Sequence, residues 1–531
     1  MFVGLLCMVA LAATAQPLFE DIWTVQSKNG VLEVFLVDEV SNVTLGEYTL
    51  ELRVWNKSMT GPLLKCKRGD TIKIYLLNKL DQVTNLHFHG FHVTPKIPGD
   101  DARFMLPNNN KVKMYEFTIP MNHPQGMFWY HSHAMPFSEW QIFNGMSGPF
   151  IVEGLLDPLP ELSTVVEKTV LLRDMQIVDG AVPSQLDFVG EAPTIRFVNH
   201  QIFPNLSCPV NETQLWSIAN IGADISYLLA WERPDGSFAD EIGLWFVAWD
   251  GILMNNKVPI TNEFYLGPGN RVQILVRCPS APVDIKMVTR KFSNGIPTDE
   301  FPTTDLIRVD VSGVARNAIS DLNVTFPALK DYRQSDVSAE RNVVFTQGAE
   351  EEEAPVVPGG EVEGSFFING KPFSKARVDV RTFLGSVERW FIINRSPEFH
   401  YFHIHQGHFQ VVAVDGVPVP FHGYMDTVFV DRPQNGSAEV VVEIIIPFTN
   451  PDQVGKYSFH CHIEGHADGG MMATLEVIDS PKLDVVFVAI AIPVLFIILV
   501  ASSGFLFYQW RQDQKASKTL LPTSQEDETK Q

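Results

Sequence analysis

The sequence is poor in positive charge: 40 Lys and Arg residues stand against 62 Asp and Glu residues, and the formal net charge over 531 residues is −22. This excess of negative charge repels phosphate backbones and excludes nucleic acid as a partner, while cations and neutral organic molecules stay open. Charged residues amount to 19% and hydrophobic residues to 45%, which excludes a disordered or collagen-like chain. At this length, two to three folded units of ordinary domain size are expected.

Cysteine is also scarce, with five residues. Cys7 lies in a segment that we expect to be removed, so Cys66, Cys208, Cys278 and Cys461 remain in an oxidising compartment. These four allow one or two disulfides. Cys461 stands between two histidines and is assigned to a metal, and among the other three we expect Cys208 to pair with Cys278 inside one domain.

Two long apolar runs lie near the ends of the chain. Residues 1–15 lack the usual basic start but end in small residues, which predicts a secretory signal peptide cut near Ala15 or Gln16. Residues 485–508 carry no charge and are long enough to cross a bilayer as one helix, which Pro493 could kink. A buried core helix or a tail removed for a lipid anchor is disfavoured by the polar segment that follows.

Basic residues flank the second run unequally. Arg511, Lys515 and Lys518 follow it and only Lys482 lies just before it, so residues 509–531 are expected in the cytoplasm. This predicts a single-pass type I membrane protein with an extracellular or lumenal ectodomain, at the plasma membrane. Seven Asn-x-Ser/Thr triplets support export, beginning at Asn42, Asn56, Asn205, Asn211, Asn323, Asn394 and Asn435.

Short runs rich in Val, Ile, Phe, Tyr and Thr, punctuated by Gly, Pro and Asn, predict an all-β chain before the apolar C-terminal run. The phrases at residues 67–80, 211–222 and 384–396 resemble one another, and each reads as a strand that ends at Asn. A second pair, VAWDG at 247–251 and VAVDG at 412–416, leads toward turns. Three related β-sandwich units are therefore expected, at about 20–156, 161–313 and 321–479. Residues 349–364, acidic and rich in Pro and Gly, are expected to form a loop.

Ten of the fifteen histidines fall in four short groups. Residues two apart in a strand face the same side, so each His-x-His presents two imidazoles to one metal cluster. A single His-x-His is weak evidence for a metal site, since it also occurs in zinc hydrolases and on strand surfaces. Four such groups, all in the two terminal units, are not explained as histidines that merely pack in a core. The groups are His87 and His89; His131 and His133; His400, His403 and His405; and His460, His462 and His466.

The last group contains a cysteine. Strand alternation sends Cys461 to one face while His460 and His462 point to the other, so one tripeptide touches two sites. A thiolate with two histidines and a weak axial methionine is the ligand set of a blue-copper centre. Copper is favoured over zinc because an electron can pass through Cys461 to its neighbouring imidazoles, whereas zinc has no redox chemistry. The ligands present are His400, Cys461, His466 and Met471.

In this order and at these separations, the four groups resemble the copper motifs of three-domain multicopper oxidases, the family of laccases, ascorbate oxidases and bilirubin oxidases. The phrases HFHGFHV, HPQGMFWYHSHA, FFINGKPF and YSFHCHIEGHADGGMM carry the resemblance, which covers nearly the whole ectodomain. It implies three consecutive cupredoxin-like Greek-key β-sandwiches, with a trinuclear copper site between the first and the third. The middle unit becomes a spacer and pocket wall.

The resemblance also implies four copper ions and a role for each ligand. Type 1 copper is assigned to His400, Cys461, His466 and Met471, type 2 copper to His87 and His403, and the type 3 pair to His89, His131, His133, His405, His460 and His462. The other histidines, His92, His123, His200, His408 and His422, fall outside the pattern, and ordinary packing is favoured for them over support of the ligands.

Four one-electron oxidations at the type 1 site would then reduce dioxygen to two waters at the cluster, which requires protons. Resembling oxidases often carry an acid shortly after the first His-x-His-Gly, and Asp100 or Asp101 is the candidate. Some relatives place a second acid directly after the type 1 histidine. Ala467 stands there instead, followed by Asp468, which puts proton delivery on that side in doubt.

The electron donor is left between two classes. A phenol or aromatic amine, as for a laccase, needs an aromatic-lined pocket at the edge of His466 or His400, and it is placed first. A ferroxidase or cuprous oxidase acting on Fe(II) or Cu(I) at the cell surface needs carboxylates there, and Glu398, Glu464 and Asp468 are close in sequence. A transporter partner is left open. A copper-free binding or structural relative is the remote alternative, against which the complete ligand set argues.

Overall fold

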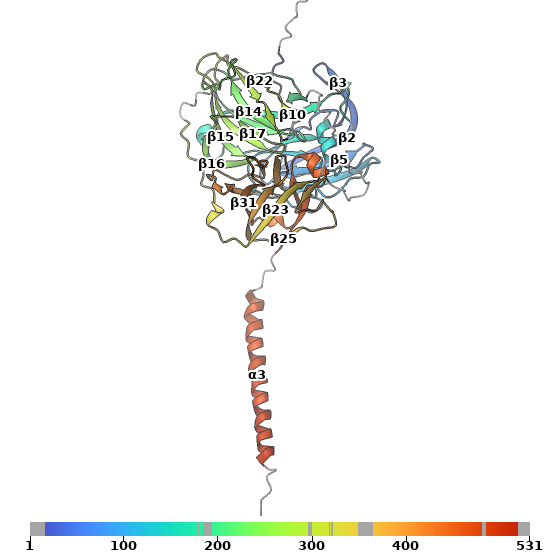
Figure 1. Ribbon diagram of the computed structural model, residues 1–531, viewed down its shortest axis with the longest axis vertical. Helices are drawn as coiled ribbons and strands as arrows, with labels where there is room; N and C mark the ends of the chain where they lie inside the picture. The colour runs from blue at the N-terminus through green and yellow to red at the C-terminus, as the bar shows by residue number, and fades with distance from the viewer. Residues whose placement is uncertain are drawn as a thin grey trace, which may run out of the picture. The chain divides into compact units, whose positions relative to one another are not determined.

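The computed structural model describes residues 16–178, 180–183, 194–295, 300–317, 319, 322–348, 365–479 and 485–518. The signal peptide predicted at 1–15, the loop expected at 349–364 and the tail beyond residue 518 lie outside these residues. The chain divides into two compact units, Met1–Asp479 and Ser480–Gln531, and the regular elements described in the first are strands apart from short helices, as the ribbon in Figure 1 shows. The all-β prediction is confirmed.

The strands fall into three consecutive groups, and among the described residues no sheet mixes strands from two groups. The first group forms a five-stranded sheet, in the order β1-β4-β9-β8-β6, and a four-stranded sheet, in the order β3-β2-β5-β7. Its elements are β1 (Thr24–Gln26), β2 (Val31–Leu45), β3 (Tyr48–Trp55), β4 (Leu63–Cys66), β5 (Thr71–Asn78), β6 (His87–His89), β7 (Lys111–Thr118), β8 (Gly126–His131), α1 (Ser138–Asn144) and β9 (Ser147–Val152).

The second group forms a six-stranded sheet, β11-β10-β13-β18-β15-β16, a five-stranded sheet, β12-β22-β19-β14-β17, and the small pair β20-β21. Its elements are η1 (Pro160–Leu162), β10 (Val166–Gln176), β11 (Thr194–Val198), β12 (Asn205–Ser207), β13 (Thr213–Asn220), β14 (Tyr227–Glu232), β15 (Gly243–Trp249), β16 (Ile252–Pro259), β17 (Phe264–Leu266), β18 (Arg271–Arg277), β19 (Asp284–Thr289), β20 (Phe292–Ser293), β21 (Glu300–Phe301) and β22 (Thr304–Asp310).

The third group repeats this plan with the sheets β24-β23-β26-β31-β28-β29 and β25-β33-β32-β27-β30. Its elements are η2 (Tyr332–Gln334), β23 (Ala339–Gln347), β24 (Phe366–Ile368), β25 (Val380–Phe383), β26 (Ser386–Asn394), β27 (His400–Ile404), β28 (Gln410–Val414), β29 (Val417–Pro418), β30 (Thr427–Val430), β31 (Val440–Phe448), η3 (Pro451–Gln453), β32 (Gly455–Cys461), α2 (Glu464–Asp468) and β33 (Met472–Ile478). The grouping supports the domain limits 20–156, 161–313 and 321–479, which remain a proposal.

The three similar sequence phrases form the equivalent strands β5, β13 and β26. Each ends at a fully buried asparagine, Asn78, Asn220 or Asn394. In all three, the side-chain oxygen accepts from the backbone N–H two residues later and the amide donates to two backbone carbonyls. A buried loop that leaves a strand must satisfy its backbone groups, and asparagine does this with one side chain.

The second sequence pair also has one structural explanation. Asp250 and Gly251, and likewise Asp415 and Gly416, occupy the left-handed turns that join β15 to β16 and β28 to β29. In both hairpins the first strand has a register shift three residues before the turn aspartate, at Val247 where β15 pairs with β18 and at Val412 where β28 pairs with β31. A left-handed Asp-Gly pair suits a tight hairpin, because Gly accepts a positive φ without cost.

Separate apolar cores hold the three sandwiches together. Each contains a tryptophan of zero exposure: Trp55 in the first, Trp216 in the second and Trp390 in the third. The expected disulfide joins Cys208 to Cys278 within the second core, and Cys66 and Cys461 are buried free thiols. The pairing prediction is therefore confirmed.

The last helix, α3 (Val485–Lys518), lies in the other unit and continues through Pro493. Its segment Pro493–Lys515 is long and apolar enough to cross a membrane, with mean hydropathy 1.6 and none of that stretch buried. The helix begins at the predicted residue 485 but extends ten residues beyond the predicted end at 508, so Arg511 and Lys515 lie within it.

Candidate metal centre

The first pair of histidine motifs comes together by strand pairing. β6 carries His87 and His89 and runs antiparallel to β8, with His87 directly opposite His131. His133 follows two residues after the end of β8, so its side chain returns to the same face. All four side chains are buried. Local strand alternation therefore builds half of the cluster.

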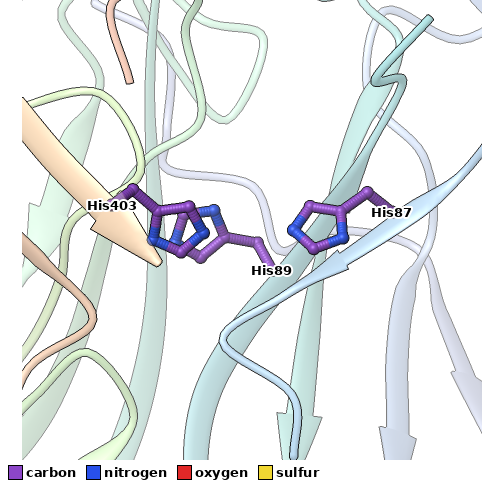
Figure 2. A group of neighbouring side chains, drawn as sticks. All are labelled: His87, His89 and His403. Carbon is purple, nitrogen blue, oxygen red and sulfur yellow. The ribbon is translucent and has the colours of Figure 1, made fainter. Parts of the chain in front are cut away.

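The third strand group builds the other half in the same way. His403 on β27 lies opposite His460 on β32. The two halves meet ring on ring: His87 stacks on His405, and His89 on His403, each with ring centroids 3.8 Å apart. Figure 2 shows the overlapping rings of His89 and His403 with His87 facing them.

Eight imidazoles thus surround one interior site between the first and third strand groups. Their nitrogens form sets of three that lie within 4.8 Å of one another, which is the spacing of ligands around one ion. The sets are His87, His89 and His403; His89, His131 and His462; and His133, His405 and His460. The last two sets divide the six histidines assigned to the type 3 pair, and the first contains both assigned to type 2 copper.

Outer partners hold four of the eight rings with one nitrogen toward the interior. Nδ1 of His131 and of His460 donates to the backbone carbonyl of the next residue, each at 2.8 Å, and Nδ1 of His403 donates to the Asp426 carbonyl at 2.8 Å. The Asp100 carboxylate holds His87 Nδ1 at 3.0 and 3.1 Å. Because one nitrogen carries the proton, the other is a free lone pair, which is the arrangement that metal-binding histidines have.

The donor set fits a metal. Nε2 of His87, His131 and His403 is buried and has no hydrogen-bond partner among the residues that the structure describes. Elsewhere nitrogens face each other, as between His405 and His460, whose Nε2 atoms are 3.1 Å apart. Burial lowers the pKa of seven of these histidines, to about 3 for His133, so they stay neutral and able to bind an ion.

A second donor set lies on the other face of the same tripeptide. The Cys461 sulfur is 3.5 Å from His400 Nδ1 and 3.6 Å from His466 Nδ1, and these two nitrogens are 3.0 Å apart. Burial alone lowers the pKa of His466, but Cys461 and Glu398 outweigh it and raise this pKa to about 10. The spot therefore favours positive charge, as a cupric ion would supply. One sulfur and two nitrogens are the donors of a blue-copper site.

Met471 lies beside this set. It is buried, its backbone carbonyl accepts from the Cys461 N–H at 3.1 Å, and its own N–H donates to the His466 carbonyl at 2.8 Å. These bonds hold the methionine next to both ligands, and its axial role remains a prediction. Phe366 stacks on the His466 ring with centroids 4.2 Å apart.

The predicted acids lie in different places. Asp100 is fully buried against His87, and burial raises its pKa to about 7. Asp101 is only half-buried and bonds the Arg103 N–H instead. Glu398 lies against His466, with Oε2 3.6 Å from its Nε2. Asp468 accepts from the Glu139 N–H at 2.9 Å, away from the ligands.

Two contributors were not foreseen in these roles. Glu464 was considered only as a cation-binding carboxylate, yet its Oε1 lies 3.5 Å from His462 Nδ1, so a buried carboxyl does stand on the side where Ala467 replaces an acid. Asp426 Oδ1 lies 3.0 Å from His89 Nε2. Glu464 could have been predicted from the sequence, because it lies two residues after His462. Nothing in the sequence marks Asp426.

The remaining histidines lie outside both sets, as expected. His92 and His408 contact each other across the first and third strand groups, with Nε2 and Nδ1 3.2 Å apart. His123 accepts from the His92 N–H, and His422 faces Asn256. His200 sits in a left-handed turn of the second strand group.

Comparisons with known proteins place this chain beside relatives of similar sequence. Two sequence profiles, both described as multicopper oxidase, match residues 39–156 and 339–481. A multicopper oxidase of Staphylococcus haemolyticus is 27% identical over 465 residues, which cover 86% of this chain and 88% of the relative. The cell division protein FtsP of Proteus mirabilis is 24% identical, with 81% and 87% covered.

Solved structures share the fold. A multicopper oxidase from Campylobacter jejuni, described as a metallo-oxidase, superposes with a TM-score of 0.72 at 22% identity, covering 88% of this chain and 95% of that chain. McoA from Aquifex aeolicus gives a TM-score of 0.72 at 19% identity, covering 88% and 100%.

Proposed function

Because this chain belongs to the multicopper oxidase family and is an oxidoreductase, we propose that it couples one-electron oxidation of a reducing substrate to four-electron reduction of dioxygen to water. One observation carries the proposal: Cys461 faces a sulfur-and-nitrogen set while His460 and His462 face the eight-histidine cluster. A structural or binding relative without copper would have no use for two such donor sets joined by three residues.

The residues would divide the work as follows. His400, Cys461 and His466, with Met471 as the predicted axial ligand, would hold one copper, and the eight-histidine cluster three. Copper supplies reversible one-electron chemistry and the reduction of dioxygen. The tripeptide His460-Cys461-His462 provides a covalent path between the sites, and Asp100 orients His87 and is the predicted proton carrier, with Asp101 the alternative.

Copper analysis of the full-length chain in detergent tests this proposal. We expect four copper ions per chain, an intense visible thiolate-to-copper band and oxygen consumption when a reductant is added. A purified chain that takes up no copper from cupric salt would instead be the copper-free relative.

Two classes of electron donor remain, and a side chain next to His466 could bind each of them. Phe366 provides an aromatic wall for a phenol-like donor. Glu398 provides a carboxylate for Fe(II) or Cu(I), and although burial alone raises its pKa, His466 holds the pKa of Glu398 below its ordinary value, so that it stays ionised. An anionic oxygen beside the electron-accepting ligand favours a cationic donor, which makes the metal-oxidase function the second candidate.

Glu398→Gln distinguishes the donors. If the donor is a cation, the variant raises KM for ferrous or cuprous ion and leaves that for a methoxyphenol unchanged. Phe366→Ala is the matched variant, since it removes the aromatic wall and keeps the carboxylate. If the donor is a phenol, Phe366→Ala raises KM for the methoxyphenol, and Glu398→Gln leaves KM for the metal ions unchanged.

We also propose that α3 anchors the protein as a single-pass membrane protein, with the metal-binding unit outside and residues 509–531 in the cytoplasm. The exposed apolar side chains of Pro493–Lys515 support an anchor. Glycosidase sensitivity of the predicted sequons, together with protease removal of a C-terminal epitope only after permeabilisation, tests this topology.

A further inference from the structure

Arg271 begins β18, in the strand group that contributes no histidine to either donor set. Its side chain is fully buried. A buried guanidinium is costly unless every N–H finds an acceptor, so its contacts indicate what the position is for.

All five N–H donors of Arg271 are used, and they reach all three strand groups. Nη1 and Nη2 donate to the two carboxylate oxygens of Asp426 at 2.9 and 2.7 Å, which is bidentate pairing. Nε donates to the Met127 carbonyl at 3.3 Å. The remaining donors reach the carbonyls of Gly269 and Asp250 at 2.8 and 2.9 Å.

Asp426 connects Arg271 to the histidine cluster. The oxygen that Arg271 Nη1 contacts also lies 3.0 Å from His89 Nε2. A carboxylate paired with guanidinium can only accept, so the His89 proton is fixed on Nε2. Nδ1 of His89 is then the free lone pair, and it faces His462 Nε2 at 3.0 Å.

Two glycines show that the backbone is fitted closely around this contact. A Cβ on Gly90 would lie 2.4 Å from Arg271 Nη2 and 2.6 Å from an Asp426 oxygen. Gly269, with φ +84°, would place a Cβ 2.9 Å from carbons of both His89 and His462. The segment before Arg271 therefore packs directly on the two imidazoles.

We infer that Arg271 is a positioning residue of the middle strand group, which holds His89 through Asp426 in the orientation that the set His89, His131 and His462 needs to bind copper. The inference rests on the proposed function and gives the middle group a role beyond that of spacer. Arg271 does not touch the Cys461 set, so its effect is confined to the histidine cluster.

The test is Arg271→Lys in the full-length chain, loaded with copper and titrated with a chelator. Lysine keeps the charge but lacks the planar fork that contacts both Asp426 oxygens. We expect the near-ultraviolet band of the coupled copper pair to be lost at roughly 10- to 100-fold lower chelator concentration, the usual effect of losing an outer partner of a metal ligand. The visible thiolate-to-copper band should persist at the wild-type concentration.

Arg173→Lys is the matched control. Arg173 is also a buried arginine of the middle strand group, and it donates to the Ile142 carbonyl at 2.6 Å and to the Ser147 hydroxyl, with no hydrogen bond to Asp426 or to a histidine of either set among the described residues. We expect a lower thermal unfolding temperature with both bands unchanged. Asp426→Asn offers a second route if Arg271→Lys folds poorly, because it breaks the bidentate pairing while keeping side-chain size, and it should reproduce the selective loss.

Three results overturn the inference. In the first, Arg271→Lys and Asp426→Asn keep the coupled-pair band at wild-type chelator concentrations. In the second, both bands of these variants fall together, as general damage to the fold would cause. In the third, the wild-type chain itself binds no copper, which removes the proposed function along with the inference and is recognised before any variant is made.

Discussion

The two donor sets differ in how much of the molecule each requires. His400, Cys461 and His466 belong to one strand group, and their geometry follows from the pairing of β27 with β32 and the turn into α2. The eight-histidine cluster takes half of its rings from the first group and half from the third, and Arg271 of the second braces it. The first set is therefore a local product of one sandwich, while the second requires the first and third sandwiches to be docked and, by our inference, is braced by the second.

The most severe way to separate the two sets is Cys461→Ser. Removing the thiolate should abolish the visible band and all turnover, because the donor electrons lose both their acceptor and their path. The cluster should keep its copper, since His460 and His462 bond through rings that the substitution does not touch. Metal analysis should fall from four ions to three.

A fall to zero copper in Cys461→Ser would mean that the two sets are not independent. Cys66→Ser is the matched control, because Cys66 is the other buried free thiol in the described structure and belongs to neither donor set.

Opening the disulfide tests the dependence of the cluster on the middle group. Replacing both Cys208 and Cys278 by Ala releases a constraint between residues 70 apart, which stabilises by about 4 kcal/mol in the loop-entropy account. In rising denaturant, the coupled-pair band should disappear before the visible thiolate band. Simultaneous loss of both bands, followed in one titration, would contradict the comparison.

Asp100 and Asp101 probe the edge of the cluster on the first group. Asp100→Asn should slow turnover by roughly 10- to 100-fold, because the amide cannot hold His87 Nδ1 as the carboxylate does. Asp101→Asn should change the rate less than twofold, since Asp101 contacts no ligand in the described structure. Steady-state oxygen consumption at neutral pH measures both. Equal rates in wild type and both variants would remove the proton carrier.

Asp38 gives the smallest effect and concerns stability away from either set. Burial on β2 raises the pKa of Asp38 well above its ordinary value, and the Trp55 indole opposes this only in part. Folded Asp38 thus keeps a proton that it releases in the unfolded chain. The contribution of Asp38 to stability is therefore fully present below its pKa in the unfolded chain and is lost as pH rises through its pKa in the folded protein. Asp38→Asn should therefore stabilise by about 1–2 kcal/mol at pH 8 and have no effect near pH 3.

If thermal unfolding shows the same gain for Asp38→Asn at both pH values, ionisation of Asp38 is not its cause. The copper bands should be unchanged throughout, because Asp38 contacts neither set.

The grouping of the candidate ligands could be predicted because it depends on short-range geometry. Two-residue spacing in a strand places both rings on one face, so His87, His89, His460 and His462 could be assigned to one cluster, and Cys461 to the opposite side. The strand phrases ending at Asn78, Asn220 and Asn394 repeat for an equally local reason. Sequence thus indicated both the sandwich plan and the ligand set.

The bracing could not be predicted, since it depends on docking. Arg271 and Asp426 are single residues 155 positions apart, and neither lies in a motif. Asp100 was within reach of prediction because it follows His87 closely, and its contact with that ring follows from a short connection. The far end of α3 differed because charged Arg511 and Lys515 do not stop a helix, although they limit an apolar run.

The face-to-face rings of His87 with His405 and His89 with His403 have a consequence for the life of the protein in a cell. Between the first and third sandwiches His89 Nδ1 lies 3.0 Å from His462 Nε2, and if both nitrogens carry the lone pairs that the ligand assignment requires, this contact attracts only weakly until copper binds between them. Copper that binds only the closed form then acts as a ligand of the native state and lengthens its survival. We expect the amount of this protein to follow copper supply through degradation rather than synthesis, which pulse-chase half-lives in copper-starved and copper-fed cells would reveal.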